Sequence, residues 1–503
     1  MGLNNIAKSS GIVLLLSFAA TTIGYFLRLF LARNLSLSEY GLFYAVLVFV
    51  GFFATFRDPG LGTALAKFIP EFMVKKQLGR VKASIFFVST VQILLGLVIV
   101  VPIFLFSDWI AINYFGTADA TLPIKLISLS FLISIVMSLL QTVFQGLERM
   151  FYFAMVEPLR LSLVLIISFL LISTGLAGPA YGYLIAPIIV SVVLFVALLR
   201  ASPLLRVKAE VDKALIRKLF FFGLPLFVGG LGSVLISYMD TIILTLFRSL
   251  DEVGLYQAAL PTSQLLWFFI GGIGSVLLPA VSSLWSAGRK EDVSDGILIL
   301  TKILFMIIVP LAILFVAFSE IILRILFGET FVAASQSLQI LAVGSIFYTF
   351  YFMFTLILIA IGKPTTYTKL LFSVGGIGII LNIILTPIFG ITGAALSTTI
   401  SYTFGLILAV VYAKKFIEIT FPLSGMAKAL LGGIIVLVLI SAVKASLDLD
   451  PLLEIFIAGI ASVIMYTAFA LRFIINKGDL KILSAIGIRL PSPLNKRLEK
   501  MLK

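Results

Sequence analysis

The feature that most constrains this chain is a series of apolar runs, each about 20 residues long, with short connections between them. A helix of that length spans the hydrocarbon core of a bilayer. A backbone in lipid must satisfy its own hydrogen bonds, so a chain that crosses repeatedly forms a helical bundle or a closed barrel. Barrel strands are short alternating segments, and the runs here are long and continuous. We therefore expect an all-α integral membrane protein.

Composition supports this class and removes several kinds of chemistry. Apolar residues make up 61% of the chain and charged residues 12%, whereas soluble domains are about 25% charged. The sequence has no Cys and no His. This excludes disulfides, thiol chemistry and iron–sulfur sites, and it argues against zinc sites and imidazole proton relays. We expect neither a metal nor a cofactor.

The apolar pattern predicts fourteen membrane spans with no soluble domain between them. Their approximate cores are 12–31, 40–56 (continuing to about 66), 84–106, 122–145, 152–173, 180–199, 219–246, 254–284, 301–318, 336–361, 367–388, 392–413, 427–445 and 454–475.

The distribution of Lys and Arg predicts the orientation of these spans. Cytoplasmic loops of membrane proteins are enriched in both residues. With the N-terminus inside, the inner connections hold most of the 37 Lys and Arg, and the outer side holds Arg33, Lys125, Arg248, Arg324 and Lys444. We expect a multi-pass protein of the cell membrane with both termini in the cytoplasm. The net charge of +14 then reflects topology and attraction to anionic membrane lipids, not binding to nucleic acid.

An internal repeat divides the chain into two similar halves. Residues 29–47 align with 242–260, Gly60–Leu65 with Gly272–Leu277, and Phe106–Gly116 with Phe318–Gly328. The offset spans six helices, an even number, so the halves share one orientation in the membrane. We expect two six-helix lobes plus two C-terminal helices, with rocking of the lobes giving alternating access. The predicted boundaries are 1–200 for the N-lobe, 201–218 for a cytoplasmic connector, 219–415 for the C-lobe, 416–476 for the last two helices and 477–503 for a basic cytoplasmic tail.

Five segments along the chain resemble one family of transporters. They are NLSLSEYGLFYAVL, RDPGLGTALAKFIPEF, SYMDTIILTLFRSLDEVGLYQAAL, ILIAIGKPTTYTK and INKGDLKILSAIGIRLP. Together they resemble the Wzx-type polysaccharide flippases of the multidrug/oligosaccharidyl-lipid/polysaccharide exporter superfamily. The resemblance implies translocation of a polyprenyl-pyrophosphate-linked oligosaccharide from the cytoplasmic to the outer leaflet. It also implies a central cavity between two lobes, a lateral groove for the lipid tail at the last two helices, and polysaccharide assembly enzymes as candidate partners.

Two ionisable residues lie at equivalent places in the first and seventh spans. Arg28 aligns next to Asp240 at the repeat offset. Charged residues at membrane depth are costly and usually face the bundle interior or a cavity. We hypothesise that Arg28 and Asp240 pair across the cavity and help to close its outer side. The alternative is that Arg28 extends to the outer interface.

Arg57 and Asp58 adjoin Pro59, Gly60 and Gly62, which predict a break in the second span. Arg57 is a candidate ligand for pyrophosphate because its planar fork donates paired hydrogen bonds to phosphate oxygens. The alternative is a local ion pair that ends a helical turn. The resembled superfamily includes the lipid II flippase, which has cationic residues in its first two spans, a placement that Arg28 and Arg57 match loosely.

Glu157 and Arg160 lie three residues apart on the fifth span and so share one helix face. Both a structural ion pair and a site facing the cavity fit this spacing. The arginine on the first span favours an anionic substrate over the cations that drug exporters carry.

The main alternative function is a cation-coupled multidrug antiporter of the same superfamily, and a second is a membrane glycosyltransferase or polymerase. The antiporter would need an acid in the N-lobe cavity, and the transferase would need catalytic acids in a large external loop. The chain has no GxxxxGK[ST] loop, so it does not hydrolyse ATP by itself. We expect a monomeric transporter, not an enzyme, with Na⁺ or H⁺ as the candidate coupling ion.

Overall fold

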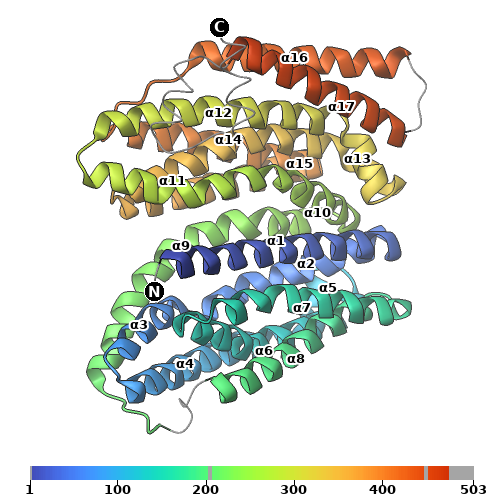
Figure 1. Cartoon of the computed structure of the whole chain (residues 1–503). Coiled ribbons are helices and arrows are strands. Elements are labelled where there is room, and N and C mark those ends of the chain that lie inside the picture. The colour runs from blue at the N-terminus through green and yellow to red at the C-terminus, as the bar shows by residue number, and fades with distance from the viewer. Residues whose placement is uncertain (1–2, 202–206, 447–450, 475–503) are drawn as a thin grey trace. The chain divides into compact units, whose positions relative to one another are not determined.

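The computed structural model describes residues 3–201, 207–446 and 451–474 (Figure 1). The predicted basic tail, 477–503, lies outside the described residues. The described part is helical throughout and contains no strand, so the prediction of an all-α integral membrane protein is confirmed.

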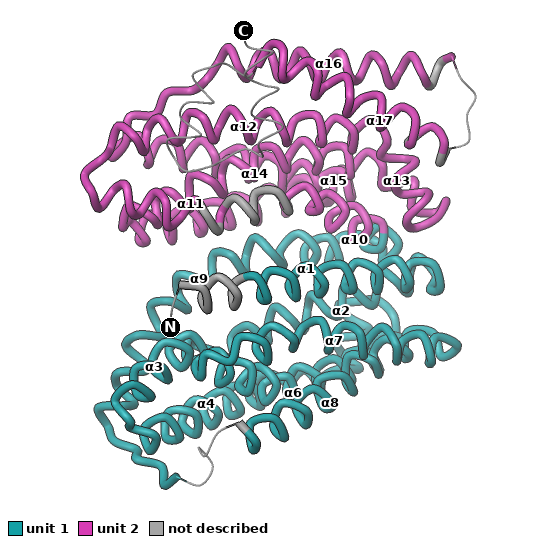
Figure 2. Tube along the Cα trace, viewed as in Figure 1, with its two compact units in different colours: residues 1–254 teal, residues 255–503 magenta. Residues whose placement is uncertain are grey.

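The chain forms two compact units, residues 1–254 and 255–503 (Figure 2). The helices of unit 1 are α1 (Leu3–Asn34), α2 (Leu37–Ala54), α3 (Leu61–Val74), α4 (Leu78–Leu105), α5 (Ser107–Asn113), α6 (Thr121–Gly146), α7 (Met150–Leu170), α8 (Ala177–Ala201) and α9 (Lys213–Phe247). Short 3-10 turns lie between them at η1 (Thr55–Arg57), η2 (Ala118–Ala120) and η3 (Ile172–Thr174).

Helix α10 (Leu250–Gln264) begins at the end of unit 1, and the remaining helices belong to unit 2. These are α11 (Phe268–Ser286), α12 (Lys290–Ala317), α13 (Ser319–Leu326), α14 (Ser335–Ala360), α15 (Pro364–Ala413), α16 (Leu423–Ser446) and α17 (Pro451–Phe469). Two 3-10 turns, η5 (Leu265–Trp267) and η6 (Glu329–Ala334), and a π-helical turn, η7 (Ala470–Ile474), complete the unit.

Twelve helices among the described residues are long and apolar enough to cross a membrane. The difference from the fourteen predicted spans has two causes. Helix α15 runs for 50 residues and joins two predicted spans across a non-helical Gly390. The predicted span 254–284 is instead interrupted by η5, which leaves α10 and α11 as separate shorter helices.

The backbone repeats its geometry from one half of the chain to the other. Gly175 has φ 62° and ψ −135°, and Gly390 has φ 58° and ψ −135°. Two further pairs with positive φ are Gly116 with Gly328 and Glu148 with Gly362. Helix α5 after α4 likewise corresponds to α13 after α12. The duplication seen in the sequence is therefore present in the turns as well as in the helices.

Matching helix starts explain one block of the sequence repeat. At α2, the Ser36 hydroxyl accepts a hydrogen bond from the Glu39 backbone N–H at 3.2 Å, and the Glu39 carboxylate accepts one from the Ser36 N–H at 2.9 Å. At α10, the Ser249 hydroxyl accepts from the Glu252 N–H at 3.3 Å. A Ser with a Glu three residues later satisfies N–H groups that a helix start leaves open. The identities that align the halves here thus begin equivalent helices.

One central helix organises each unit. In unit 1, α6 packs against α2, α3, α4, α7 and α8. In unit 2, its counterpart α14 packs against α11, α12 and α15. Helices α6 and α14 have the same length, 26 residues, so their positions can be compared one by one.

Helix α9, the predicted seventh span, packs against α2, α3 and α4. It therefore belongs to unit 1 by contact, although it begins the second repeat in sequence. The predicted domain boundaries follow the repeat and the compact units follow packing, so the boundaries stay a prediction.

Large apolar side chains are exposed on the outer faces of the helices. Val98 on α4 is 70% exposed, Phe169 on α7 is 64% exposed and Ile464 on α17 is 64% exposed. Soluble monomers rarely expose continuous apolar surface. These faces fit a hydrocarbon solvent, in agreement with the membrane spans.

Candidate functional site

The candidate site of unit 1 begins at the break between α2 and α3. Gly60 has a φ of 78°, in the left-handed region that favours glycine. A Cβ at Gly60 would also lie 2.0 Å from the carbonyl oxygen of Gly223 on α9. The chain can turn here and approach α9 only because residue 60 has no side chain. This close approach holds Arg57, three residues before Gly60, against the interior of the unit.

Arg57 is half-buried and directed toward the middle of α6. Its Nη1 donates to the backbone carbonyl of Phe131 and, at 2.8 Å, to the hydroxyl of Ser134. Among the described residues, Nε and Nη2 have no hydrogen-bond partner. Two adjacent donors of a guanidinium fork match two oxygens of a phosphate. The arrangement leaves Arg57 able to bind an anionic group without giving up its anchor on α6.

Asp58 has a different role from its neighbour. Its two carboxylate oxygens accept from the backbone N–H of Gly62 at 3.1 and 3.2 Å. A carboxylate at this place satisfies an open N–H group at the start of α3 and favours the positive end of the helix dipole. The carboxylate also lies close enough to Arg57 to attract it. Asp58 therefore fixes the start of α3, while Arg57 turns away from it toward α6.

A second group of polar residues lies on α1, α2, α7 and α8, and we call it the arginine–tyrosine cluster. Its members are Arg28, Tyr40, Tyr44, Glu157, Arg160 and Tyr183. The guanidinium carbon of Arg28 lies 4.1 Å from the ring centroid of Tyr44, and Arg28 also donates to the hydroxyl of Tyr40. The negative face of an aromatic ring attracts a cation. Arg28 is thus held inside unit 1 by two tyrosines one helical turn apart.

Glu157 and Arg160 form an ion pair within this cluster. Arg160 Nη2 and Nε donate to Glu157 Oε2 at 2.7 and 3.1 Å. The side chain of Arg160 is 20% exposed and that of Glu157 is 44% exposed. The guanidinium carbon of Arg160 lies 5.8 Å from the ring centroid of Tyr183, which is also close enough to Arg28 to interact with it. Tyr183 therefore connects the two arginines.

Helix α6 links the cluster to Arg57. Its Ser130 hydroxyl donates to the backbone carbonyl of Tyr183 at 2.7 Å. Ser134, the partner of Arg57, lies one turn farther along the same face. Helix α6 thus contacts Arg57 directly and the arginine–tyrosine cluster through Tyr183.

Asp240 lies half-buried on α9. Its pairing with Arg28 stays a prediction. Tyr40, Tyr44 and Tyr183 are not among the site residues predicted from the sequence. The spacing of Tyr40 and Tyr44 could have indicated their role. Two aromatic residues four apart on one helix share a face, so both can contact an arginine of the preceding helix.

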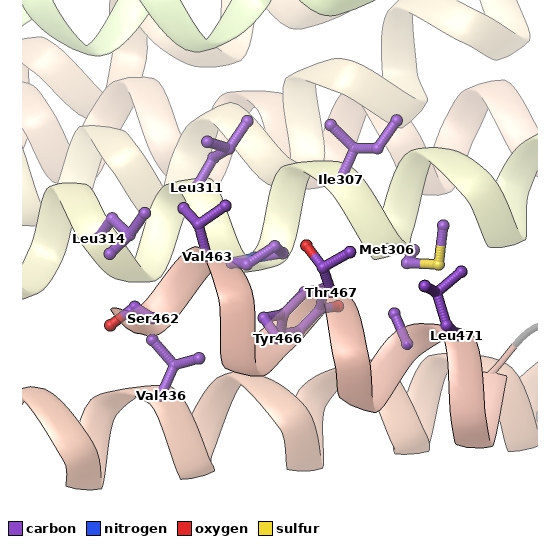
Figure 3. Close-up of a pocket in the computed structure, with 12 residues that line it drawn as sticks. Met306, Ile307, Leu311, Leu314, Val436, Ser462, Val463, Tyr466, Thr467 and Leu471 are labelled. Atoms are coloured by element: carbon purple, nitrogen blue, oxygen red, sulfur yellow. The ribbon is translucent and has the colours of Figure 1, made fainter. Parts of the chain in front are cut away.

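Unit 2 contains an apolar pocket of about 320 Å³ (Figure 3). Residues of α12, α16, α17 and η7 line it, among them Leu311, Val436 and Val463. The hydroxyls of Ser462 and Tyr466 also belong to the lining and have no hydrogen-bond partner among the described residues. The size and apolar character of the pocket fit a hydrocarbon chain. Among the described residues, no group of three or more His, Cys, Asp or Glu side chains could hold a metal ion.

Comparisons with known proteins agree on the type of protein. A family model described as "Polysaccharide biosynthesis protein" matches residues 6–285, and one described as "MatE" matches residues 225–388. The "Uncharacterized membrane protein MJ1068" of Methanocaldococcus jannaschii is 31% identical over 464 residues, which cover 89% of this chain and 91% of the relative. The "Probable low-salt glycan biosynthesis flippase Agl15" of Haloferax volcanii is 26% identical over 445 residues, which cover 88% of this chain and 91% of the relative. A solved structure titled "Lipid II flippase MurJ, inward closed conformation" superposes with a TM-score of 0.76 at 19% identity, over 91% of this chain and 97% of that one, which shows a common fold.

Proposed function

The chain belongs to the polysaccharide biosynthesis protein family, and from this premise we propose that it flips a polyprenyl-pyrophosphate-linked oligosaccharide across the membrane. Transfer runs from the cytoplasmic to the outer leaflet of the cell membrane by alternating access. The relative from Haloferax volcanii, which is matched over most of both chains, is named as a glycan biosynthesis flippase. The chain acts as a transporter and not as an enzyme.

The observation that carries this proposal is Arg57 at the break between α2 and α3. It combines a firm anchor on α6 with two donors left open. An arginine fork binds a phosphate strongly where water is scarce, because the two charges are poorly screened there. We assign the pyrophosphate of the substrate to Arg57. The arginine–tyrosine cluster provides further positive charge in unit 1. We take Arg28, Arg160, Glu157 and Asp240 as candidate residues along the translocation path and Asp58 as the residue that positions the break.

The lipid chain of the substrate needs a separate, apolar surface. The pocket of unit 2 between α12 and α17 offers one of suitable character (Figure 3). Keeping the hydrocarbon in such a surface avoids drawing it through a polar cavity, which would cost about 0.8 kcal/mol for every CH₂ group exposed to water. Only the pyrophosphate and the sugars then have to cross the interior.

The membrane potential favours this direction of transport. A charge that crosses the whole potential changes its free energy by about 2.3 kcal/mol per 100 mV. The cytoplasm is the negative side, so outward movement lowers the electrostatic free energy of the anionic pyrophosphate. A Na⁺ or H⁺ gradient would add to this drive. The proposed partners are the lipid-linked substrate, the membrane lipids and polysaccharide assembly enzymes, and we propose a monomer.

A cation-coupled multidrug antiporter is the second candidate, supported by the "MatE" match to residues 225–388. It is the weaker one, because the anchored charge at the break is an arginine. A site for cationic drugs would be expected to present an open carboxylate at this place, whereas the Asp58 carboxylate is bound to the start of α3.

Reconstitution in liposomes tests the proposal. The purified protein receives fluorescent polyprenyl-pyrophosphoryl oligosaccharide, and an external quencher or lectin reports the fraction transferred. We expect transfer that depends on the protein. The transfer should fall at least about tenfold in Arg57→Ala, because loss of a charge-assisted hydrogen bond costs about 1.5–3 kcal/mol. It should persist in Arg149→Ala. Arg149 is exposed at the turn before α7 and serves as the matched control. Absence of transfer, together with export of cationic dyes under an ion gradient, would favour the antiporter instead.

A further inference from the structure

Unit 2 contains a second helix break that corresponds to the one at Arg57. In unit 1, α2 ends in the 3-10 turn η1, whose last residue is Arg57. In unit 2, α10 ends in the 3-10 turn η5, whose last residue is Trp267. The two turns hold the same place in the order of elements. The last residue of this turn is thus a Trp in one half and an Arg in the other, although the sequence repeat aligns Arg57 itself with Phe269.

The contacts of these two residues correspond position by position. Trp267 Nε1 donates to the hydroxyl of Ser345 at 3.2 Å, and its ring stacks on Tyr348 with centroids 3.9 Å apart. Ser345 and Tyr348 are the eleventh and fourteenth residues of α14. The partners of Arg57, Phe131 and Ser134, are the eleventh and fourteenth residues of α6. The repeat has thus kept the geometry of the break and changed its chemistry from cationic to aromatic.

Trp267 is part of a larger group that we call the aromatic cluster. Its members are Trp267, Tyr348, Tyr351, Phe352 and Tyr402. Tyr348 lies at the centre, with ring centroids 4.9 Å from Tyr402, 6.0 Å from Phe352 and 6.2 Å from Tyr351. Trp267, Tyr348 and Phe352 are half-buried, so part of their ring surface is open.

One polar atom in the cluster, the Tyr351 hydroxyl, is not satisfied by a hydrogen bond within the described residues. The Tyr351 hydroxyl is buried, in a residue that is 3% exposed, and it has no hydrogen-bond partner among the described residues. A buried hydroxyl without a partner costs about 1–3 kcal/mol, and native structures rarely retain one without a reason. A ligand with hydroxyl groups would supply the partner.

We propose that the aromatic cluster binds a sugar ring of the lipid-linked substrate. A pyranose presents a flat face of C–H groups, which packs on an aromatic face, and a rim of hydroxyls, which can bond to Tyr351. A hydrocarbon chain would pack on the rings but would leave the Tyr351 hydroxyl unsatisfied. This inference rests on the proposed function and assigns the glycan to unit 2, as Arg57 assigns the pyrophosphate to unit 1.

Intrinsic fluorescence can report this binding directly. The chain has three Trp residues, at 109, 267 and 285. Trp109→Phe with Trp285→Phe leaves Trp267 as the sole reporter, and Trp109 is 64% exposed, so its replacement should be tolerated. Titration with polyprenyl-pyrophosphoryl oligosaccharide should shift the Trp267 emission, while the same lipid without sugars should not. An equal response to both lipids would overturn the proposal, as would a response to cationic dyes alone.

Tyr351→Phe provides a second measurement in the otherwise unchanged protein. It should weaken binding of the glycan-bearing lipid about three- to tenfold, as expected for the loss of one neutral hydrogen bond. Its Tm should stay the same or rise, because the change removes an unsatisfied buried group. Ser337→Ala is the matched control, since its hydroxyl on the same helix is also buried without a partner among the described residues but lies outside the aromatic cluster. The control should leave binding unchanged.

The outcomes separate this inference from the proposed function. Transport by the wild-type protein that Tyr351→Phe leaves intact, with no Trp267 response to glycan, overturns the aromatic site and keeps the flippase. Absence of transport by the wild-type protein overturns the flippase itself.

Discussion

At the scale of single residues, the intramembrane Arg57 is held in place by neutral groups, and Arg28 also contacts neutral side chains. Arg57 bonds to a carbonyl and a hydroxyl, and Arg28 lies on Tyr44 and bonds to Tyr40. Isolated charges in a medium of low dielectric constant are costly. Neutral acceptors and ring faces reduce this cost but, unlike carboxylates, do not cancel the charge. Arg57, held in this way, keeps its attraction for an anionic substrate.

Gly60 is the residue on which the position of Arg57 depends. Gly60→Ala should lower the free energy of unfolding by more than about 2 kcal/mol, because a left-handed φ costs a side-chain-bearing residue about 1–2 kcal/mol. The new Cβ would in addition meet the Gly223 backbone oxygen, which cannot swing aside as a side chain can. Thermal unfolding in detergent measures the loss of stability, and the liposome assay should show reduced transfer.

Gly362→Ala separates the two contributions. Gly362 has a φ of 79° and nothing within 4 Å of the position of a Cβ, so only the backbone strain applies. If both variants lost the same stability, the close approach of α3 to α9 would have no energetic role.

At the scale of elements, α3 and α9 are also joined by an ion pair outside the predicted spans. The Glu71 carboxylate on α3 accepts from Lys75 at 2.8 Å and from Lys218 on α9 at 2.9 Å. These bonds, led by the one from Lys75, hold the pKa of the Glu71 carboxyl at about 2 instead of its usual 4.5. The folded state therefore binds this proton less tightly than the unfolded state does.

Glu71→Gln should consequently destabilise the protein in a manner that depends on pH. A lowered pKa contributes stability that is complete above the unfolded pKa and is lost as pH falls through the folded pKa. The difference in Tm between wild type and Glu71→Gln should be largest at neutral pH, shrink below about pH 4.5 and vanish near pH 2. A constant difference over that interval would contradict the ion-pair assignment.

At the scale of the whole molecule, the repeat has produced two halves of the chain with the same turns and different functional groups. The central helices α6 and α14 are equal in length. Each contacts the neighbouring helix break through its eleventh and fourteenth residues. A transporter for a substrate with a charged group and a sugar group can use this difference, because each half recognises a different part. Duplication followed by divergence at one turn is sufficient to create it.

The proposed orientation can be tested without background, because the chain has no Cys. Ala118→Cys and Lys415→Cys are both at exposed positions near helix ends. A membrane-impermeant maleimide should label Ala118→Cys on intact cells and Lys415→Cys only after lysis, since Lys-rich and Arg-rich connections remain in the cytoplasm. The reverse pattern would invert the topology and with it the proposed direction of transport.

The sequence alone determined the class of the protein, the number of apolar segments to within two, and the duplication. It did so because the apolar length of a span and the similarity of two segments are local properties that can be read along the chain. It also identified Arg28, Arg57, Asp58, Glu157, Arg160 and Asp240 as candidates, since a charge in an apolar run is conspicuous at once.

Only the tertiary structure decided which partners Arg57, Asp58 and Arg160 have. It directs Arg57 to α6 and Asp58 to the start of α3, although the two are neighbours in sequence. It assembles the aromatic cluster from residues 267, 348 and 402, which no pattern in the sequence connects. Such contacts depend on the rotation and approach of helices packed side by side. Hydropathy sets neither of these, and small features such as the missing side chain of Gly60 set both.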